Sequence, residues 1–430
     1  MILVYTHTVS TRLQYVCEFI FKETLGIDFE ITTSKEICKD FTGLIINYSK
    51  EDLPGSFKVE STELLFEKDI RPQDIITFQA ENYIAFFKLN GSHFLFDIFA
   101  AVFYLLSRYE EYLPHEKDSY GRFAHQNSLA FKEGFLDQPL INMWLQDFSQ
   151  ILKAFFPPIN YKQLTFKFLP TYDIDIAWSF KNKGVKRNVG GFLNNPSFSR
   201  MKVLAGAEKD PFDSYQYLHE LHVQYKLKPL YFFLVALETG RYDKNISPLH
   251  SEMKKLIKEH AAIYEVGLHP SWKSNEDKKL LKEEIKCLEK LSGEKRVTIS
   301  RQHYIKFTLP YTFEHLINFD IQHDYSMGYG SINGFRASTT SSFYWYDIAK
   351  EQRTNLILHP FCFMDANSFY EQDYDAEEAF EELMHYYRAC KKVNGQMITI
   401  FHNNFLGTDI KFKGWKEMYE KFLRVVSEPE

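Results

Sequence analysis

The feature that most constrains the fold is a repeated order of apolar run, loop and helix that begins near residue 164. The apolar runs show little strict alternation, which is typical of parallel strands covered on both faces. Predicted strands span 165–173, 229–236, 262–268, 296–300, 319–324, 355–361 and 396–401. Seven such units predict a (β/α) barrel, with a doubly wound open sheet as the competing arrangement.

Helices are predicted in several gaps between these strands, at 211–225, 248–259 and 275–292. Asp210 precedes the first of them. Ser247 is the expected N-cap of the second, and Ser274 with Asp277 forms the expected capping box of the third.

The region before residue 160 follows a different pattern, with short β-like runs and predicted helices at 11–25, 96–113 and 137–155. The prolines of "FFPPIN" mark a boundary, because they end a helix and stiffen the chain that follows. A chain of 430 residues is also too long for one ordinary core. We therefore predict a smaller α/β domain of unassigned role at 1–160 and a barrel domain at 161–430.

Composition excludes several classes of function. The net charge of −6 and the lack of a basic stripe argue against a nucleic-acid partner. Five scattered cysteines without a CxxC pair predict free thiols, and an N-terminus without a basic region is unlike a signal peptide, so the expected location is cytoplasmic. The most apolar stretch, "FDIFAAVFYLLSRYEEYL", includes Asp97, Arg108 and Glu110, which predicts a buried helix and no membrane partner. The oligomeric state stays open.

Ionisable side chains recur where the predicted strands end. In a barrel of parallel strands, chemistry gathers at the carboxyl ends. The strand-end residues are Asp173, Asp175, His269, Arg301, His303, Asp324, His359 and His402. A single histidine in such a place is commonly a structural residue, but buried charges need partners, so the joint placement indicates a site.

Two aspartates end the first of these strands. Side chains two apart on a strand share a face, so Asp173 and Asp175 are predicted to point the same way and to repel each other. A divalent cation held by one of them, with the other kept as a base beside Arg301, resolves the conflict. With His269 and His303 a three-ligand site results, which leaves a position open for water, as in catalytic zinc sites.

At these residues the chain resembles the polysaccharide deacetylase (NodB-homology) superfamily, over about residues 165–410. Thr171, Tyr172 and Asp173 are similar to the start of its Thr-Phe-Asp-Asp motif, with the second aspartate one place late at Asp175. "RQHY" is similar to Arg-x-Pro-Tyr, and "MITIFH" is similar to the motif that ends in histidine. The leading region resembles the one that precedes such domains in a group of bacterial proteins, which predicts a divergent member with an extra N-terminal domain.

The resemblance implies a distorted (β/α)7 barrel and a role for each matched residue. Asp173 would be the catalytic base beside Arg301, Asp175 a metal ligand and His402 the general acid. The second histidine of the His-x-x-x-His motif is Lys273 here, and Thr399 replaces the usual leucine. We interpret His303 as the ligand that replaces the histidine missing at 273, which completes the set Asp175, His269 and His303.

The predicted activity is metal-assisted removal of an N-acyl or O-acyl group from a sugar, with zinc as the expected ion. Carbohydrate contacts are predicted at Trp178, Trp272, Tyr304, Asp324 and Arg336. Two alternatives remain. One is a carbohydrate-binding protein without turnover, suggested by Lys273 and Thr399. The other is a metal-free glycoside hydrolase that uses Asp173 and Asp324.

Overall fold

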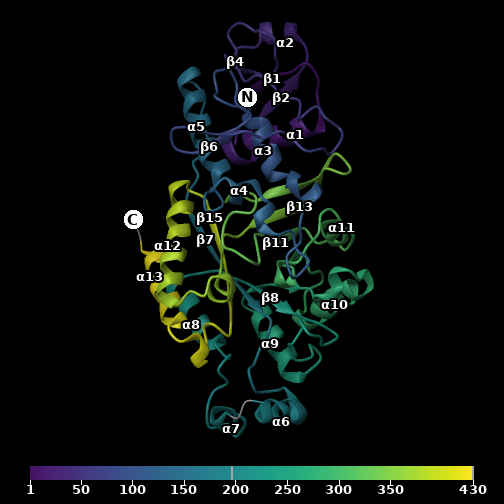
Figure 1. Cartoon of the computed structure of the whole chain (residues 1–430), viewed down its shortest axis with the longest axis vertical. Helices are drawn as coiled ribbons and strands as arrows, with labels where there is room; N and C mark the ends of the chain where they lie inside the picture. The colour runs from purple at the N-terminus through teal and green to yellow at the C-terminus, as the bar shows by residue number, and fades with distance from the viewer. Residues whose placement is uncertain (195–196, 429–430) are drawn as a thin grey trace. The chain divides into compact units, whose positions relative to one another are not determined.

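The computed structural model describes residues 1–194 and 197–428, and the chain divides into two compact units (Figure 1). Unit 1 comprises residues 1–166, 335–360 and 389–395, and unit 2 comprises the described residues of 167–334, 361–388 and 396–430. The chain therefore leaves unit 1 three times and returns to it twice.

Unit 1 contains a four-stranded parallel sheet with the strand order β2-β1-β3-β4. Every residue of β1 and β3 is buried, as expected for the two central strands. Two antiparallel pairs, β5 with β6 and β12 with β13, also belong to this unit. The strands are β1 (Ile2–Tyr5), β2 (Phe29–Thr32), β3 (Leu44–Asn47), β4 (Phe57–Lys58), β5 (Thr77–Gln79), β6 (Ile84–Phe86), β12 (Phe343–Asp347) and β13 (Gln352–Pro360).

The most apolar stretch of the chain forms the buried helix α3, as predicted. All nine residues of α3 are buried, and its N-cap Asp97 accepts hydrogen bonds from the Ala100 amide at 3.0 Å and the Tyr48 hydroxyl at 2.8 Å. The helix predicted at 11–25 is confirmed as α1 followed by a π-helical segment to Leu25. The helices of unit 1 are α1 (Thr11–Cys17), α2 (Lys35–Asp40), α3 (Ile98–Leu106), α4 (Leu129–Lys132) and α5 (Leu140–Phe155).

Unit 2 is built on a curled parallel sheet with the order β11-β10-β9-β8-β7-β15-β14 (Figure 1). Every neighbouring pair in this order is parallel. The strands are β7 (Lys167–Ile174), β8 (Leu230–Leu234), β9 (Glu265–His269), β10 (Ile299–Ser300), β11 (His323–Met327), β14 (Phe363–Met364) and β15 (Gln396–His402). Because all run in one direction, their carboxyl ends lie at one edge.

The strand predicted at 355–361 is confirmed as β13. β13 pairs antiparallel with β12, and His359 is its last residue but one. The short strand β14 follows directly and pairs with β15 instead. Pro360 is the last residue of β13, because proline cannot donate to a strand ladder.

Helices pack on the parallel sheet, with α9 and α10 contacting β9. Two expected caps were wrong: α9 begins after His250 rather than Ser247, and Asp277 alone caps α10, accepting from the amides of Lys279 and Leu280. The helices are α6 (Gly184–Asn194), α7 (Phe198–Leu204), α8 (Tyr215–Tyr225), α9 (Ser251–Ala261), α10 (Lys278–Ser292), α11 (Tyr311–Asn318), α12 (Ala376–Lys392) and α13 (Trp415–Ser427).

Across residues 1–194 and 197–428, no helix has both the length and the apolar character that crossing a bilayer requires. All five cysteines are free thiols, as predicted.

Candidate metal and catalytic site

The end of β7 presents Thr171, Asp173 and Asp175 on one face, as alternation along a strand requires. Arg301, which follows β10, reaches the first two of them. Its Nη1 donates to Thr171 Oγ1 at 2.7 Å and to Asp173 Oδ1 at 2.8 Å. The guanidinium is fully buried, and its Nε donates to the carbonyl of Tyr325 at 3.0 Å. Arg301 therefore balances the charge of Asp173 but makes no such pair with Asp175.

Asp175 lies instead among imidazoles. Its Oδ1 is 3.1 Å from His269 Nε2, and its Oδ2 is 3.4 Å from His303 Nε2. One donor atom from each of these three residues lies within 4.8 Å of the others, a spacing that permits a shared metal ion. Zinc–nitrogen bonds of about 2.0–2.1 Å in a tetrahedron place donor atoms roughly 3.4 Å apart. The spacing of these donors fits such an ion.

Both imidazoles are held so that Nε2 faces Asp175. His269 Nδ1 donates to the Arg301 carbonyl at 2.6 Å, and His303 Nδ1 donates to Asp243 Oδ1 at 3.0 Å. Metal-binding histidines generally donate their other ring nitrogen in this way. His269 Nε2 is close to Asp175 Oδ1 but makes no hydrogen bond with it, so this buried oxygen has no hydrogen-bond partner among the described residues. This buried oxygen without a hydrogen-bond partner shows, independently of the donor spacing, that the residues present fit a cation.

The electrostatics of the cluster follow from these contacts. Burial acts to raise the pKa of Asp175, but His303 and His269 outweigh it and hold that pKa well below its usual range. Burial acts to lower the pKa of His303, but Asp175 and Asp243 outweigh it and raise that pKa to about 9. The cluster therefore favours positive charge beside Asp175.

His402 ends β15, where its register partner on the neighbouring strand is Asp173. Its Nδ1 donates to Asp365 Oδ1 at 2.6 Å, and its backbone amide donates to Asp365 Oδ2 at 2.7 Å. Its Nε2 lies 3.5 Å from Asp175 Oδ2. Burial opposes protonation, but Asp365 and Asp175 together raise the pKa of His402 well above its usual value. Asp365 thus orients the His402 ring and favours its protonated form.

An aromatic group adjoins the metal ligands. Trp272 stacks on Tyr242 with ring centroids 4.1 Å apart, and Tyr304 meets Trp272 edge-on at 5.5 Å. The ring of Tyr304 also lies 4.5 Å from that of His303. Of the predicted sugar-binding residues, Trp272 and Tyr304 are therefore brought together beside the site, and both are only half-buried.

The other predicted sugar-binding residues have different surroundings. Trp178 is buried and contacts the ring of Tyr215. Asp324 is fully buried, accepting from Ser300 Oγ at 2.8 Å and from the Ser326 amide at 2.9 Å.

Arg336 belongs to unit 1 and is buried there. Its Nε and Nη2 donate to Glu111 at 2.9 and 2.7 Å. Burial opposes ionisation of Glu111, but Arg336 and Arg108 lower its pKa to about 2. A substrate role for Arg336 stays a prediction.

Sequence reasoning missed two carboxylates, Asp243 and Asp365. Asp365 directly follows β14, so it would have been found as a strand-end residue had β14 been predicted. Asp243 lies deep in the loop after β8 and gives no such signal. Lys273, at the position of the missing histidine, is exposed and pairs with Glu238 at 2.5 Å.

Glu284 on α10 is a buried carboxyl group behind the site. Its Oε2 accepts from the Ser271 amide at 3.0 Å, and Oε1 has no hydrogen-bond partner among the described residues. Burial raises its pKa to about 7. Because the folded pKa lies above the unfolded one, its stabilising contribution is full below about pH 4.5 and is lost as pH rises to about 7.

We therefore expect Glu284→Gln to be more stable than the wild type at pH 8, by about 2–3 kcal/mol. The advantage should shrink as pH falls towards 4.5. Denaturant unfolding of both proteins across this range is the measurement. An unchanged difference between pH 5 and pH 8 would contradict the assigned cost of ionising Glu284.

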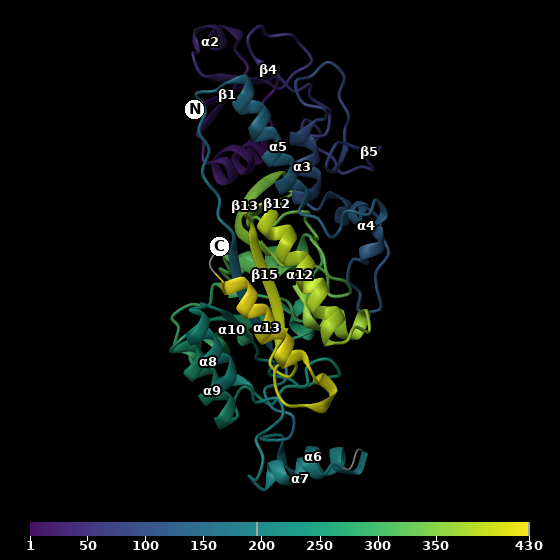
Figure 2. The same ribbon diagram turned by 90° about the vertical axis from the view of Figure 1, so that its left-hand side faces the viewer.

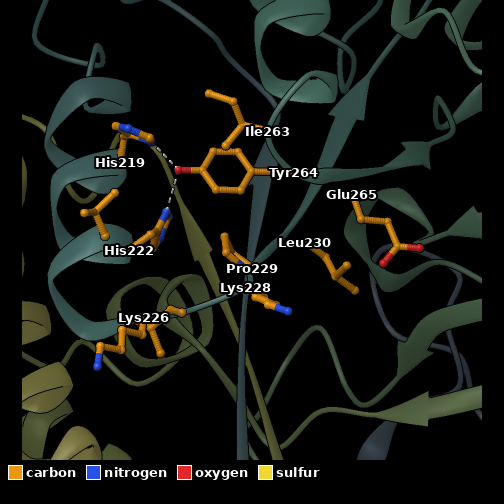
Figure 3. A pocket seen from close by; sticks show the side chains of 11 residues that line it. His219, His222, Lys226, Lys228, Pro229, Leu230, Ile263, Tyr264 and Glu265 are labelled. Carbon is orange, nitrogen blue, oxygen red and sulfur yellow. Dashed lines mark hydrogen bonds between the residues drawn. The ribbon is translucent and has the colours of Figure 1, made fainter.

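A cavity of about 530 Å³ lies at the opposite, amino-terminal end of the strands and contains none of the site residues. It is lined by the starts of β8 and β9 and by α8, and the Tyr264 hydroxyl contacts His219 at 2.7 Å and His222 at 3.3 Å (Figure 3). Burial lowers the pKa of His222 to about 3, so this imidazole is neutral. The cavity is thus separate from the cluster around Asp175.

Comparison with known families matches residues 2–157 to a family of unknown function (DUF7033). A comparison with curated proteins finds no match.

Several solved structures are similar to part of the chain. A protein of Mycobacterium smegmatis assigned to the polysaccharide deacetylases is 13% identical over 63% of this chain and 87% of its own, with a TM-score of 0.42. PuuE allantoinase is 12% identical over 62% and 85%, with a TM-score of 0.39. A Pseudomonas aeruginosa PAO1 protein, also assigned to the polysaccharide deacetylases, is 12% identical over 61% and 85%, with a TM-score of 0.39.

Proposed function

We propose that the chain is a metal-dependent hydrolase that removes an acyl group, such as acetyl, from an amino sugar or glycan. In this proposal residues 161–430 form a deacetylase-type (β/α)7 barrel and residues 1–160 a smaller α/β domain. The observation that carries the proposal is the convergence of Asp175, His269 and His303. Asp173, whose charge Arg301 balances, and His402, whose ring Asp365 orients, lie beside them.

The metal ligands in the proposal are Asp175, His269 and His303. A divalent ion bound there, with zinc favoured by the two imidazoles, supplies polarisation of the acyl carbonyl and a lower pKa for water. Asp175 is partly open to solvent, with 26% of its side chain exposed, which leaves access for water and substrate. Asp243 orients His303 through its Nδ1.

Two further groups would move protons. Asp173, held by Arg301 at 2.8 Å, accepts the proton of the attacking water. Protonated His402 donates from Nδ1 to Asp365 and carries a second proton on Nε2, which it donates to the leaving amine. Base and acid therefore come from the neighbouring strands β7 and β15.

The aromatic group supports carbohydrate as the substrate class. Trp272 and Tyr304 are half-buried and lie next to the metal ligand His303, where a sugar ring can stack. Lys306 Nζ lies 4.2 Å from the Trp272 ring centroid and adds a hydrogen-bond donor.

The alternative of a glycoside hydrolase has weaker support. It needs a second carboxylate open to substrate, but Asp324 is fully buried and engaged by Ser300 and Ser326. The alternative of a binding protein without turnover rests on Lys273 and Thr399. Both the ligand set and the proton-transfer groups are present without a histidine at 273.

The test uses the purified full-length chain. Elemental analysis should find one divalent ion per chain, and acetate release from N-acetylglucosamine oligomers and O-acetylated xylan should stop on chelation. Chain cleavage that persists after chelation would favour the glycoside hydrolase. Glycan binding with no acyl release from any substrate would favour the binding protein.

Asp365 is a positioning residue in this proposal. Asp365→Asn keeps an acceptor for His402 Nδ1 but removes the charge that favours its protonated form. We expect kcat to fall by about 10- to 100-fold, with KM and metal content unchanged. Steady-state kinetics measure kcat and KM separately, and elemental analysis measures the metal content. A parallel rise in KM or loss of metal would instead assign Asp365 a structural role.

A further inference from the structure

Unit 2 carries a helical hairpin whose apolar side chains face solvent. Helices α6 and α7 lie side by side, away from the sheet, in both Figure 1 and Figure 2. Eighteen large apolar side chains are exposed in the described part of the chain, and five of them fall in this hairpin. They are Val189, Leu193, Phe198, Met201 and Leu204, with Leu193 75% exposed and Phe198 78% exposed.

Four of these side chains are gathered on one surface. Val189, Leu193, Met201 and Leu204 line an open groove of about 650 Å³ between the two helices. Arg200 joins the helices, donating from Nη1 to the Asn188 carbonyl at 2.9 Å. Exposed apolar groups concentrated in this way mark an interaction site rather than the ordinary scatter of surface residues.

The charge of the hairpin indicates the kind of surface that it binds. Residues 179–210 contain seven lysines and arginines and two acidic residues, Glu208 and Asp210, within a chain of net charge −6. Lys202 pairs with Glu208, but both side chains are exposed and such pairs are weak. An exposed apolar groove on a segment rich in basic residues suits the interface of a membrane that contains anionic phospholipids. Association with a second copy would instead bring two basic segments together.

The base of the hairpin is held firmly. The buried carboxylate of Asp210 accepts hydrogen bonds from the amides of Ser179, Phe180 and Lys181 at 2.7, 2.8 and 2.9 Å. This corrects the expectation that Asp210 directly precedes a helix, since α8 begins at Tyr215. These hydrogen bonds link the end of the hairpin, at Asp210, to its beginning at Ser179, a few residues after Asp175.

We propose that the α6–α7 hairpin binds the surface of membranes containing anionic phospholipids. Its apolar side chains enter the headgroup region and its basic side chains pair with lipid phosphates. The chain then attaches peripherally, in contrast to the absence of a membrane partner expected from the sequence. The proposal does not depend on the activity of the Asp175 site.

The test is sedimentation of the full-length protein with lipid vesicles. We expect binding to phosphatidylcholine vesicles that contain phosphatidylglycerol, little binding to phosphatidylcholine alone, and weaker binding as salt rises. The double variant Leu193→Gln/Phe198→Gln should lower the partition coefficient at least about tenfold. The double variant Lys181→Gln/Lys202→Gln should lower it by about 25-fold, or fivefold per charge.

Matched controls are Ile410→Gln, whose side chain is 82% exposed, and Lys254→Gln/Lys258→Gln on α9, which should bind as the wild type does. Metal content and thermal unfolding of all variants should match the wild type, since the hairpin lies outside the cluster. Absence of binding to anionic vesicles, or equal binding by the Leu193/Phe198 variant, would overturn the proposal. Self-association that this variant abolishes, without vesicle binding, would assign the surface to a second copy.

Discussion

Replacing His303 by alanine is expected to remove the metal ion, while replacing Lys273 by alanine leaves it bound. His303 Nε2 lies 3.4 Å from Asp175, and Asp243 fixes its ring. Lys273 is exposed and pairs with Glu238. Loss of an orienting partner costs about 10- to 100-fold in metal affinity, so loss of the ligand itself should cost more than 100-fold.

Competition with a chromophoric chelator measures this affinity for the two variants and the wild type. Thermal unfolding of the metal-free proteins serves as the control, because it shows whether His303→Ala has lost the fold rather than the ligand. Equal metal affinity in the two variants would remove His303 from the ligand set. It would also undo the interpretation that this histidine replaces the one missing at 273.

Most strands of unit 2 could be predicted from the sequence because each is an apolar run bounded by polar loops. The apolar pattern of a strand does not show whether its neighbours run parallel or antiparallel to it. The run at 355–361 is as apolar as the others, yet β13 pairs antiparallel with β12 in unit 1. The two-residue strand β14 is too short to give a periodic signal of its own.

The metal ligands could be proposed because parallel strands bring their carboxyl ends to one edge. Asp175, His269 and His303 each follow or end such a strand, and the structure gathers their donor atoms within 4.8 Å. Asp243 could not be proposed, because a residue inside a long loop has no position until the loop is folded. The same limit applies to Trp178, which lies in the loop after β7 and is buried against Tyr215.

Asp173→Asn is expected to abolish most acyl release without loss of metal. Asparagine keeps an oxygen that accepts from Arg301 but cannot take a proton from water. General-base catalysis contributes about 10²- to 10⁴-fold, so kcat should fall by that range. The metal content should stay unchanged, because Asp173 is outside the set Asp175, His269 and His303.

This variant should also be less stable, which has to be separated from its catalytic effect. Arg301 is fully buried, and losing the charge of its acidic partner leaves a buried cation poorly compensated, at a cost of about 3–5 kcal/mol. Kinetics are therefore measured well below the unfolding temperature, with Glu284→Gln as the control that also converts a buried carboxyl group to an amide. If Asp173→Asn retained wild-type kcat while Glu284→Gln lost it, the general base would be a residue near α10 and not Asp173 on β7.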